Sequence, residues 1–363
     1  MADKLDVCVL FGGISTEHDI SQRSADTVIN ALDRDKYNVI MVGITKQGDW
    51  LRYRGDVKDI YHGEWLNDAG NVSCAAGMGD RFHGLLELAD DGTYSVTNVD
   101  VWVPCLHGVG GEDGTIQGLL ELTNIPYVGC GVLSSALCMD KATTYGMVEE
   151  YGVKCPKSRV VIGEATDEQL RDIADYLGFP IFVKPANGGS SIGVSKVDSF
   201  DELAQAARTA GAYDSKVLFE SYVKGYEISC GVMGHRGGEL KSAVPDEIWV
   251  KSGVAHLHQE AKPGTNQENS IISCPPDHAD EQDIANLKDA AYKIYRALGC
   301  EGFARVDMFL TPDHEVVFNE VNTFPGMTYY SRFPRQYRAA GYEIPQVMDD
   351  LIQMAIERSQ ARK

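Results

Sequence analysis

The sequence lacks the features of several protein classes. Its N-terminal apolar run, in MADKLDVCVLFGG, is too short to span a membrane and leads into a loop without a small-residue cleavage site. It has no basic run, and its formal net charge of -20 at pH 7 disfavours nucleic acids and anionic membranes as partners. We therefore expect a cytoplasmic protein with no nucleic-acid or membrane partner.

The nine cysteines are odd in number, scattered and without a C-x-x-C pair. This pattern argues against a disulfide framework or a zinc site and is typical of small buried side chains in a reducing compartment. The chain also has no internal repeat and no low-complexity tract. Its 363 residues are 44% hydrophobic and 24% charged, which is an ordinary globular composition over a length that predicts two or three domains.

Residues 1–130 alternate between strand and helix patterns. The apolar run LDVCVLFGG ends in paired glycines and precedes a helix that we expect to begin near Ser21. Two further runs, NVIMVGIT and VDVWVPCLHG, are almost continuously apolar, as buried parallel strands are. The pattern predicts an open α/β sheet with functional residues at the strand ends. The first loop, GGISTEH, lacks the GxGxxG spacing of a dinucleotide site, which disfavours a dehydrogenase.

Residues 131–226 and 227–363 are expected to form two further domains. A capping-box pattern starts at Thr166 before a helix, and the strand candidate IFVKP follows that helix. An amphipathic helix over 284–298 then precedes two strand candidates, FARVDMFL and EVVFNEVN, with TPDH between them. Because proline and aspartate favour turns, these two strands are predicted to form an antiparallel hairpin.

This hairpin carries the clearest candidate chemistry. Side chains alternate along a strand, so Arg305 and Asp307 share one face of the first strand, and Glu320 and Asn322 share one face of the second. Converging carboxylate and amide oxygens suit magnesium, which combines a few protein ligands with the phosphates of a substrate. The alternative is a solvated polar face of the sheet. Gly326, a few residues later, would let a backbone amide approach an oxyanion.

A second candidate phosphate element is KPANGGSSIG, residues 184–193. Its glycines and serines can turn several backbone amides toward an anion beside the ammonium group of Lys184. The stretch does not have the Walker A pattern. Considered alone, it could equally be a flexible hairpin turn.

Several stretches together resemble the D-alanine:D-alanine ligase family of the ATP-grasp superfamily. They occur in order over nearly the whole chain and are LFGGISTEHDIS, LHGVGGEDGTIQG, SSALCMDK, FVKPANGGSSIGV, RVDMFL, NEVNTFPGMT and YYSRFP. The resemblance implies three α/β domains with ATP held between the central and C-terminal domains. It also implies an enzyme that phosphorylates the carboxylate of a first D-alanine with ATP. A second substrate then attacks the acylphosphate, and ADP and phosphate are released.

The resemblance also implies the residues of the site. The ligands for two magnesium ions, which manganese could replace, are Asp307, Glu320 and Asn322. The residues that hold ATP are Lys141 and Lys184 at the phosphates, Glu220 and Val223 at the adenine, and Glu227 at the ribose.

The same resemblance implies how the substrates are held. Glu17 would bind the ammonium of the first D-alanine, with Ser190 orienting the site, and Arg305 and the Gly326 amide would bind the oxyanion. The substrate pocket would contain His107, Ser331 and Arg332, the last two at the carboxylate of the second substrate. A purely structural His107 is the alternative for that residue.

The segment GVAHLHQEAKPGTNQENS, in an expected active-site loop at about 246–270, bears on the second substrate. D-alanyl-D-alanine members usually carry roughly YDYxxKY in this loop, which this chain lacks; its HQE resembles the vancomycin-resistance ligases that make D-alanyl-D-lactate. A protonated His258 would attract the carboxylate of D-lactate and repel the ammonium of a second D-alanine. His256 departs from the pattern of those ligases. Exposed loop histidines without a role are the alternative.

The sequence is therefore interpreted as a homodimeric D-alanine:D-lactate ligase that supplies peptidoglycan precursors with reduced vancomycin binding. A D-alanine:D-alanine or D-alanine:D-serine ligase with an unusual loop is the nearer alternative, and only the products separate the two. A catalytically silent nucleotide-binding module on the same fold is the remote alternative. Such a module would be expected to have lost an acidic metal ligand or Arg305, and all of these residues are present.

Overall fold

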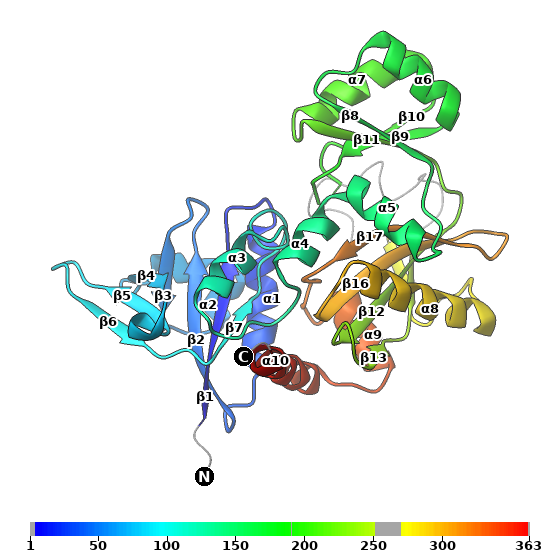
Figure 1. The fold of residues 1–363 in the computed structure, drawn as a ribbon. Coiled ribbons are helices and arrows are strands. Elements are labelled where there is room, and N and C mark those ends of the chain that lie inside the picture. Colours follow the sequence, from blue (N-terminus) through cyan, green and yellow to red (C-terminus); the bar gives the residue numbers. More distant parts are fainter. Residues whose placement is uncertain (1–3, 190, 251–269, 362–363) are drawn as a thin grey trace.

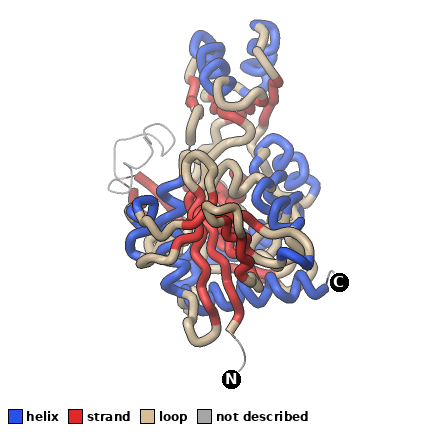
Figure 2. The backbone as a smooth tube through the Cα atoms, turned by 90° about the vertical axis from the view of Figure 1, so that its left-hand side faces the viewer, coloured by secondary structure: helices blue, strands red, loops and turns tan. Residues whose placement is uncertain are grey.

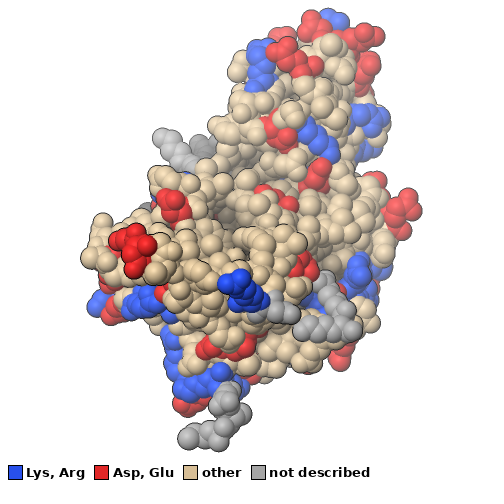
Figure 3. Space-filling model, turned by 60° about the vertical axis from the view of Figure 1, so that its left-hand side comes forward, with Lys and Arg blue, Asp and Glu red and all other residues tan. Residues whose placement is uncertain are grey.

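The structure, a computed structural model, describes residues 4–189, 191–250 and 270–361. These residues form three sheets, each with helices packed against it (Figure 1). Among the described residues, no helix is both long enough and apolar enough to cross a membrane. On the face drawn in Figure 3, basic and acidic side chains are interspersed. All nine cysteines carry free thiols and seven of them are buried, as their scattered spacing predicted.

The first sheet has seven strands in the order β6-β5-β4-β3-β2-β1-β7. The three apolar strands at one end of this order pair in parallel, as predicted, and are β1 (Leu5–Gly12), β2 (Tyr37–Ile44) and β7 (Val101–Pro104). An antiparallel extension consists of β3 (Trp50–Tyr53), β4 (Val72–Ala76), β5 (Leu85–Leu88) and β6 (Tyr94–Thr97). The helices of this part are α1 (His18–Ala31), α2 (Lys58–Tyr61), η1 (Glu64–Asn67), η2 (Asp80–Phe82) and α3 (Thr115–Leu122).

Helix α1 begins at His18, so the predicted start near Ser21 was wrong by one turn. The N-cap residue, Glu17, makes no side-chain capping bond, which removes the usual sequence signal of a helix start. The first turn is instead fixed by the buried imidazole of His18. Its Nδ1 donates to the carbonyl of Gly13 at 2.7 Å, and its Nε2 accepts from Gln22 at 2.8 Å.

The second sheet has four strands in the order β10-β9-β11-β8. With its helices it forms the upper part of the molecule in Figure 2. Its neighbouring strands are antiparallel and are β8 (Ser158–Ile162), β9 (Ile181–Pro185), β10 (Ser195–Val197) and β11 (Lys216–Ser221). The helices α6 (Asp167–Leu177) and α7 (Phe200–Gly211) pack on it. The predicted capping box is confirmed, because the Thr166 hydroxyl accepts from the Gln169 amide and the Gln169 side chain accepts from the Thr166 amide.

The third sheet has the order β15-β14-β12-β16-β17, with β13 paired to β12. Its strands are β12 (Tyr226–Gly234), β13 (Leu240–Ser242), β14 (Asp246–Val250), β15 (Ser270–Ser273), β16 (Gly302–Leu310) and β17 (Val316–Asn322). The helices in this part are α4 (Val132–Met139), α5 (Lys141–Glu150), α8 (Glu281–Ala297), α9 (Arg332–Ala339) and α10 (Ile344–Ala361). The predicted amphipathic helix is α8, and β16 and β17 form the predicted antiparallel hairpin.

Helix α10, the last helix of the described chain, packs against the first sheet. Its buried face belongs to the same core cluster as β1, β7 and α1, and Figure 1 shows it beside the first sheet. Its Arg358 donates to the carbonyls of Tyr127 and Gly129, each at 2.6 Å, and so holds the segment that leads away from the first sheet. The division into domains at residues 130 and 226 stays a prediction.

Candidate functional site

A cavity of about 550 Å³ is lined by residues of the second and third sheets and by residues from the loops and helices that adjoin all three sheets. Twelve of the sixteen predicted site residues line it, and they are Glu17, His107, Lys141, Lys184, Glu220, Val223, Glu227, Arg305, Asp307, Glu320, Asn322 and Gly326. Ser331 and Arg332 are described but do not belong to this lining. Ser190 and His258 lie outside the described residues. The structure therefore brings together residues separated by about 300 positions.

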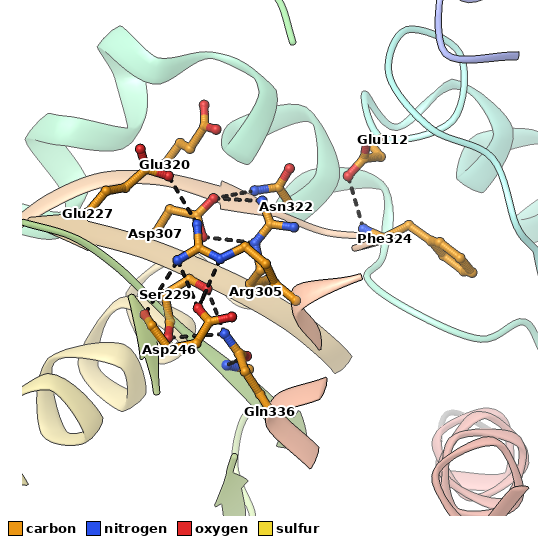
Figure 4. A network of polar contacts seen from close by, with 12 residues as sticks. Glu112, Glu227, Ser229, Asp246, Arg305, Asp307, Glu320, Asn322, Phe324 and Gln336 are labelled. Carbon is orange, nitrogen blue, oxygen red and sulfur yellow. Dashed lines mark hydrogen bonds and ion pairs between the residues drawn. The ribbon is translucent and has the colours of Figure 1, made fainter. Parts of the chain in front are cut away.

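The hairpin β16–β17 supplies one wall of the cavity (Figure 4). Arg305 lies opposite Asn322, and Asp307 lies opposite Glu320, so the convergence predicted from strand alternation is confirmed. A β-bulge follows Asp307, where the register shifts and Asn319 is left without an opposite residue. Asp307 is only 3% exposed, which excludes a solvated polar face at this position.

The Asp307 carboxylate is already paired within the protein. Arg305 donates from Nε to Oδ1 at 2.8 Å and from Nη2 to Oδ2 at 2.7 Å, which is the bidentate geometry of a strong ion pair. Asn322 donates from Nδ2 to Oδ2 at 3.0 Å. In this structure the positive charge beside Asp307 therefore comes from arginine.

Two buried lysines face the same wall. Lys141 Nζ lies 3.3 Å from Glu320 Oε2, and Lys184 Nζ lies 2.7 Å from Glu220 Oε1. Burial alone would raise the pKa of Glu320, but the charges of Lys141, Lys184 and Arg305 outweigh it and lower that pKa to about 2. Glu320 is consequently ionised at neutral pH, as a metal ligand must be.

The residues at this wall fit a hard divalent cation. Asp307, Glu320 and Asn322 offer two carboxylates and an amide oxygen to the cavity, which is the ligand chemistry that Mg²⁺ prefers. The ammonium groups of Lys141 and Lys184 suit the phosphates that such an ion accompanies.

The opposite wall is aromatic. Phe182 and Tyr222 stack with ring centroids 6.1 Å apart and both line the cavity beside Glu220 and Val223. A flat apolar surface next to a carboxylate suits a nucleobase with an exocyclic amine. Phe182 and Tyr222 were not predicted from the sequence, since aromatic residues next to a strand end are ordinary core candidates. The predicted phosphate element, residues 184–193, begins with the last two residues of β9 and lies in the connection between the antiparallel strands β9 and β10.

The first sheet contributes Glu17 and His107 to the cavity. Gly108 has a φ of +69°, and a Cβ there would lie 2.4 Å from Glu17 Oε2, so this position requires glycine. Burial lowers the pKa of His107 to about 4, and the imidazole is therefore neutral. Its ring nitrogens lie 3.0 Å from the Phe324 carbonyl oxygen and 2.9 Å from Ser24 Oγ. His107 thus lines the cavity and also has structural contacts.

Glu112 is a cavity residue that the sequence did not reveal. Its Oε2 accepts from the Gly108 amide at 2.9 Å, and its Oε1 accepts from the Phe324 amide at 3.1 Å (Figure 4). Burial first, and then the charge of Glu17, raise the pKa of Glu112 to about 8. The available signal was its place in a glycine-rich loop just after the parallel strand β7, because function is expected at such strand ends in an open α/β sheet.

Arg332 lies behind the wall of the cavity. Its Nη1 is 3.0 Å from Glu227 Oε1 and its Nη2 is 2.8 Å from Asp246 Oδ1, with only 10% of the side chain exposed. Its guanidinium is thus held by two carboxylates in this structure. The predicted contacts of Ser331 and Arg332 with a second substrate stay predictions.

Comparisons with known proteins identify the family. The family described as "D-ala D-ala ligase N-terminus" matches residues 6–130, and "D-ala D-ala ligase C-terminus" matches residues 148–353. The chain belongs to the D-alanine:D-alanine ligase family. The ATP-grasp fold and the enzyme class predicted from the sequence are therefore confirmed, and the protein is an ATP-dependent ligase.

The relatives of this ligase differ in their named substrates. It is 42% identical to the vancomycin/teicoplanin A-type resistance protein VanA of Enterococcus faecium, over 98% of this chain and 99% of that protein. It is 44% identical to a Streptomyces coelicolor protein provisionally named D-alanine–D-lactate ligase, over 97% and 98% of the two chains. The crystal structure of the VanG D-Ala:D-Ser ligase from Enterococcus faecalis superposes with a TM-score of 0.88 at 37% identity, over 97% of this chain and 100% of that chain.

Proposed function

We propose that this ligase joins D-alanine to D-lactate through a D-alanyl phosphate, with ADP and phosphate as the other products. The observation that carries the proposal is the loop sequence HQE at His258, in place of a tyrosine and lysine motif. Residues 251–269, which include His256 and His258, lie outside the described residues, so this support comes from sequence. The Streptomyces coelicolor relative, provisionally named for D-lactate, is consistent with it.

The geometry of the cavity supports the first step. Lys141 and Lys184 would hold the phosphates of ATP, and Glu17 would hold the ammonium of D-alanine so that its carboxylate faces the γ-phosphate. Two Mg²⁺ ions at Asp307, Glu320 and Asn322, or Mn²⁺ in their place, would neutralise the phosphate charge.

The second step needs a nucleophile and donors for the oxyanion. Attack on the D-alanyl phosphate forms a tetrahedral centre, whose negative oxygen would be bound by Arg305 and the Gly326 amide. Both residues line the cavity. Ser331 and Arg332 would bind the carboxylate of the incoming substrate, and Ser190 would orient the site.

His258 would select the second substrate by charge. An imidazolium attracts the carboxylate of D-lactate and repels the ammonium of D-alanine. A histidine that gains a carboxylate partner has a raised pKa, so this attraction is present at low pH and is lost as the pH rises through that pKa. Over the same rise D-alanine loses its ammonium proton and becomes a nucleophile. The ratio of depsipeptide to dipeptide should therefore fall as the pH increases.

A competition assay tests the proposal. Purified protein receives ATP, Mg²⁺, D-alanine and D-lactate from pH 6 to 9, and the products are identified by mass. We expect depsipeptide to dominate at pH 6 and its share of the products to decline as the pH rises. The variant His258→Ala should show a reduced preference for D-lactate. His256→Ala is the matched control and should leave the ratio unchanged. A ratio that is flat or rises with pH, or an unaffected His258→Ala variant, would contradict the selection by charge.

A D-alanine:D-alanine or D-alanine:D-serine ligase is the second candidate. Relatives named D-alanine–D-alanine ligase, such as that of Caldicellulosiruptor bescii at 41% identity over 99% of this chain, favour it. Dipeptide as the main product at every pH would select this function.

We further propose, on the resemblance alone, a cytoplasmic homodimer that makes peptidoglycan precursors with reduced vancomycin binding. Sedimentation equilibrium of the purified protein at micromolar concentration tests the dimer.

A further inference from the structure

The backbone of Phe324 is held on both sides by residues of the loop that follows β7. Its amide donates to Glu112 Oε1 at 3.1 Å, and its carbonyl accepts from His107 Nδ1 at 3.0 Å. Glu112 and His107 lie in the loop after β7, more than 200 positions earlier in the chain. The two peptide groups that flank the Cα of Phe324, in the segment after β17, are thus both fixed from another part of the molecule.

A third contact extends this attachment to Met327. Its amide donates to Ser24 Oγ at 3.2 Å, and Ser24 Oγ lies 2.9 Å from His107 Nε2. The directions are mutually consistent only if Ser24 donates its hydroxyl proton to Nε2, which leaves the His107 proton on Nδ1 to reach the Phe324 carbonyl. Because burial keeps His107 neutral, this tautomer satisfies every member of the chain of hydrogen bonds.

The segment 323–327 follows the hairpin and links two groups that the proposed reaction uses. It begins directly after Asn322, the last residue of the metal-binding face, and it contains Gly326, whose amide is the proposed oxyanion donor. Phe324 is itself buried, with its ring against Phe303. The backbone from 323 to 327 is therefore fixed at the amide of Phe324, at its carbonyl and at the amide of Met327.

We propose that Glu112 is a positioning residue of the ligase reaction, which fixes the backbone amide of Phe324 and thereby sets the Gly326 amide against the reacting carboxylate. The proposal rests on the proposed oxyanion role of Gly326. A carboxylate is required, because both of its oxygens accept from backbone amides, those of Gly108 and Phe324. Glutamine has one acceptor oxygen, and its amide group would meet an N–H donor at the other position.

The electrostatics of Glu112 indicate that it is kept for function. Burial and the neighbouring Glu17 oppose its ionisation, and only Arg305 and the two backbone amides favour it. A carboxyl whose folded pKa is raised above its ordinary value loses stability as the pH rises between the two values. Ionised Glu112 therefore destabilises the fold near pH 8, and a residue kept for packing alone would be expected to stabilise it.

Glu87 provides a matched control in the same sheet. It is a buried glutamate, at 6% exposure, whereas Glu112 is partly buried, and it lies away from the cavity lining. Although burial would raise its pKa, bonds from Thr97 and Arg54 outweigh that effect and lower it. Ionised Glu87 consequently stabilises the fold, which is the opposite of the effect expected for Glu112.

The experiment measures the formation of D-alanine hydroxamate from ATP, D-alanine and hydroxylamine. Hydroxylamine takes the place of D-lactate, attacks the D-alanyl phosphate through the same kind of tetrahedral centre and displaces phosphate, so D-lactate does not enter. For Glu112→Gln we expect kcat to fall by about 10- to 100-fold, because displacing a group by about 1 Å can reduce a rate about 100-fold. The KM for ATP should change by less than about 2-fold, because uniform binding is preserved. The Tm at pH 8 should be equal to or above that of the wild type. Glu87→Gln should show the reverse, a lower Tm with an unchanged kcat.

Two further readouts keep the test decisive. Glu112→Asp retains both acceptor oxygens and should recover part of the lost kcat, even if glutamine impairs folding. The kcat of the wild type should fall as the pH drops through about 8, where Glu112 gains its proton, and this dependence should be absent in Glu112→Gln. An unchanged kcat, or a lower Tm with a normal kcat per folded molecule, would overturn the proposal. Failure of the D-lactate assignment would appear only in the products of the full reaction, which this assay does not measure.

Discussion

Removing the Arg305 guanidinium should destabilise the protein strongly, and Mg²⁺ should offset part of the loss. Arg305 supplies two of the three hydrogen bonds recorded for the Asp307 carboxylate, and Asn322 supplies the third. In Arg305→Met a nearly buried carboxylate would keep only the bond to Oδ2. A buried charge that loses its partner typically costs about 3–5 kcal/mol of unfolding free energy. Because Asn322 remains, we expect the lower end of this range, about 3 kcal/mol.

Magnesium should distinguish this variant from the wild type. In the wild type Arg305 already neutralises Asp307, whereas in Arg305→Met the carboxylate would be available to a cation. A ligand at ten times its dissociation constant contributes about 1.4 kcal/mol of stability. We therefore expect Mg²⁺ to stabilise Arg305→Met more than the wild type.

Urea unfolding followed by tryptophan fluorescence, in EDTA and in MgCl₂, measures both effects. Lys58→Met is the control, because the Lys58–Asp56 pair is exposed and should matter little. A loss below about 1 kcal/mol in Arg305→Met would show that the ion pair does not determine the local stability. Equal stabilisation of both proteins by Mg²⁺ would refute the competition between arginine and the cation.

Two further predictions concern stability outside the cavity. Thr166→Ala removes one half of the capping box of α6 and should cost about 1 kcal/mol of unfolding free energy in urea, and an unchanged midpoint would contradict this. The His314–Asp283 pair raises the pKa of His314, so its stabilisation should be complete below the ordinary histidine pKa and disappear as the pH rises through the raised value. The Tm difference between the wild type and His314→Gln should accordingly be larger at pH 6 than at pH 9, and an equal difference would exclude this coupling.

Much of the fold could be predicted because its signals are local. Strands β1, β2 and β7 are continuous apolar runs. The capping box predicts the start of α6, and TPDH predicts the turn between β16 and β17. Part of the site was equally accessible. Strand alternation alone places Arg305, Asp307, Glu320 and Asn322 on one face of a hairpin, because the period of two is a property of the backbone.

The remaining features depend on contacts that no local pattern encodes. Lys141 meets Glu320 across 179 positions, and Glu112 meets Phe324 across 212. Neither pairing could be predicted from periodicity, which describes only neighbours along the chain. The same limit explains the error at α1, whose first turn is fixed by the imidazole of His18 and not by a capping residue.

The position of α10 has a consequence for how the protein is synthesised. Its apolar residues complete the core around β1 and β7, yet the ribosome adds them about 240 residues after β7 has ended. At about 5–20 residues per second, roughly 10 to 50 s separate the two events. Throughout that interval α1 can cover only part of this side of the nascent first sheet, and the apolar surface that α10 later buries is presented to chaperones. A message truncated before Ile344 would therefore yield an open first sheet, prone to aggregation, and not a smaller working enzyme.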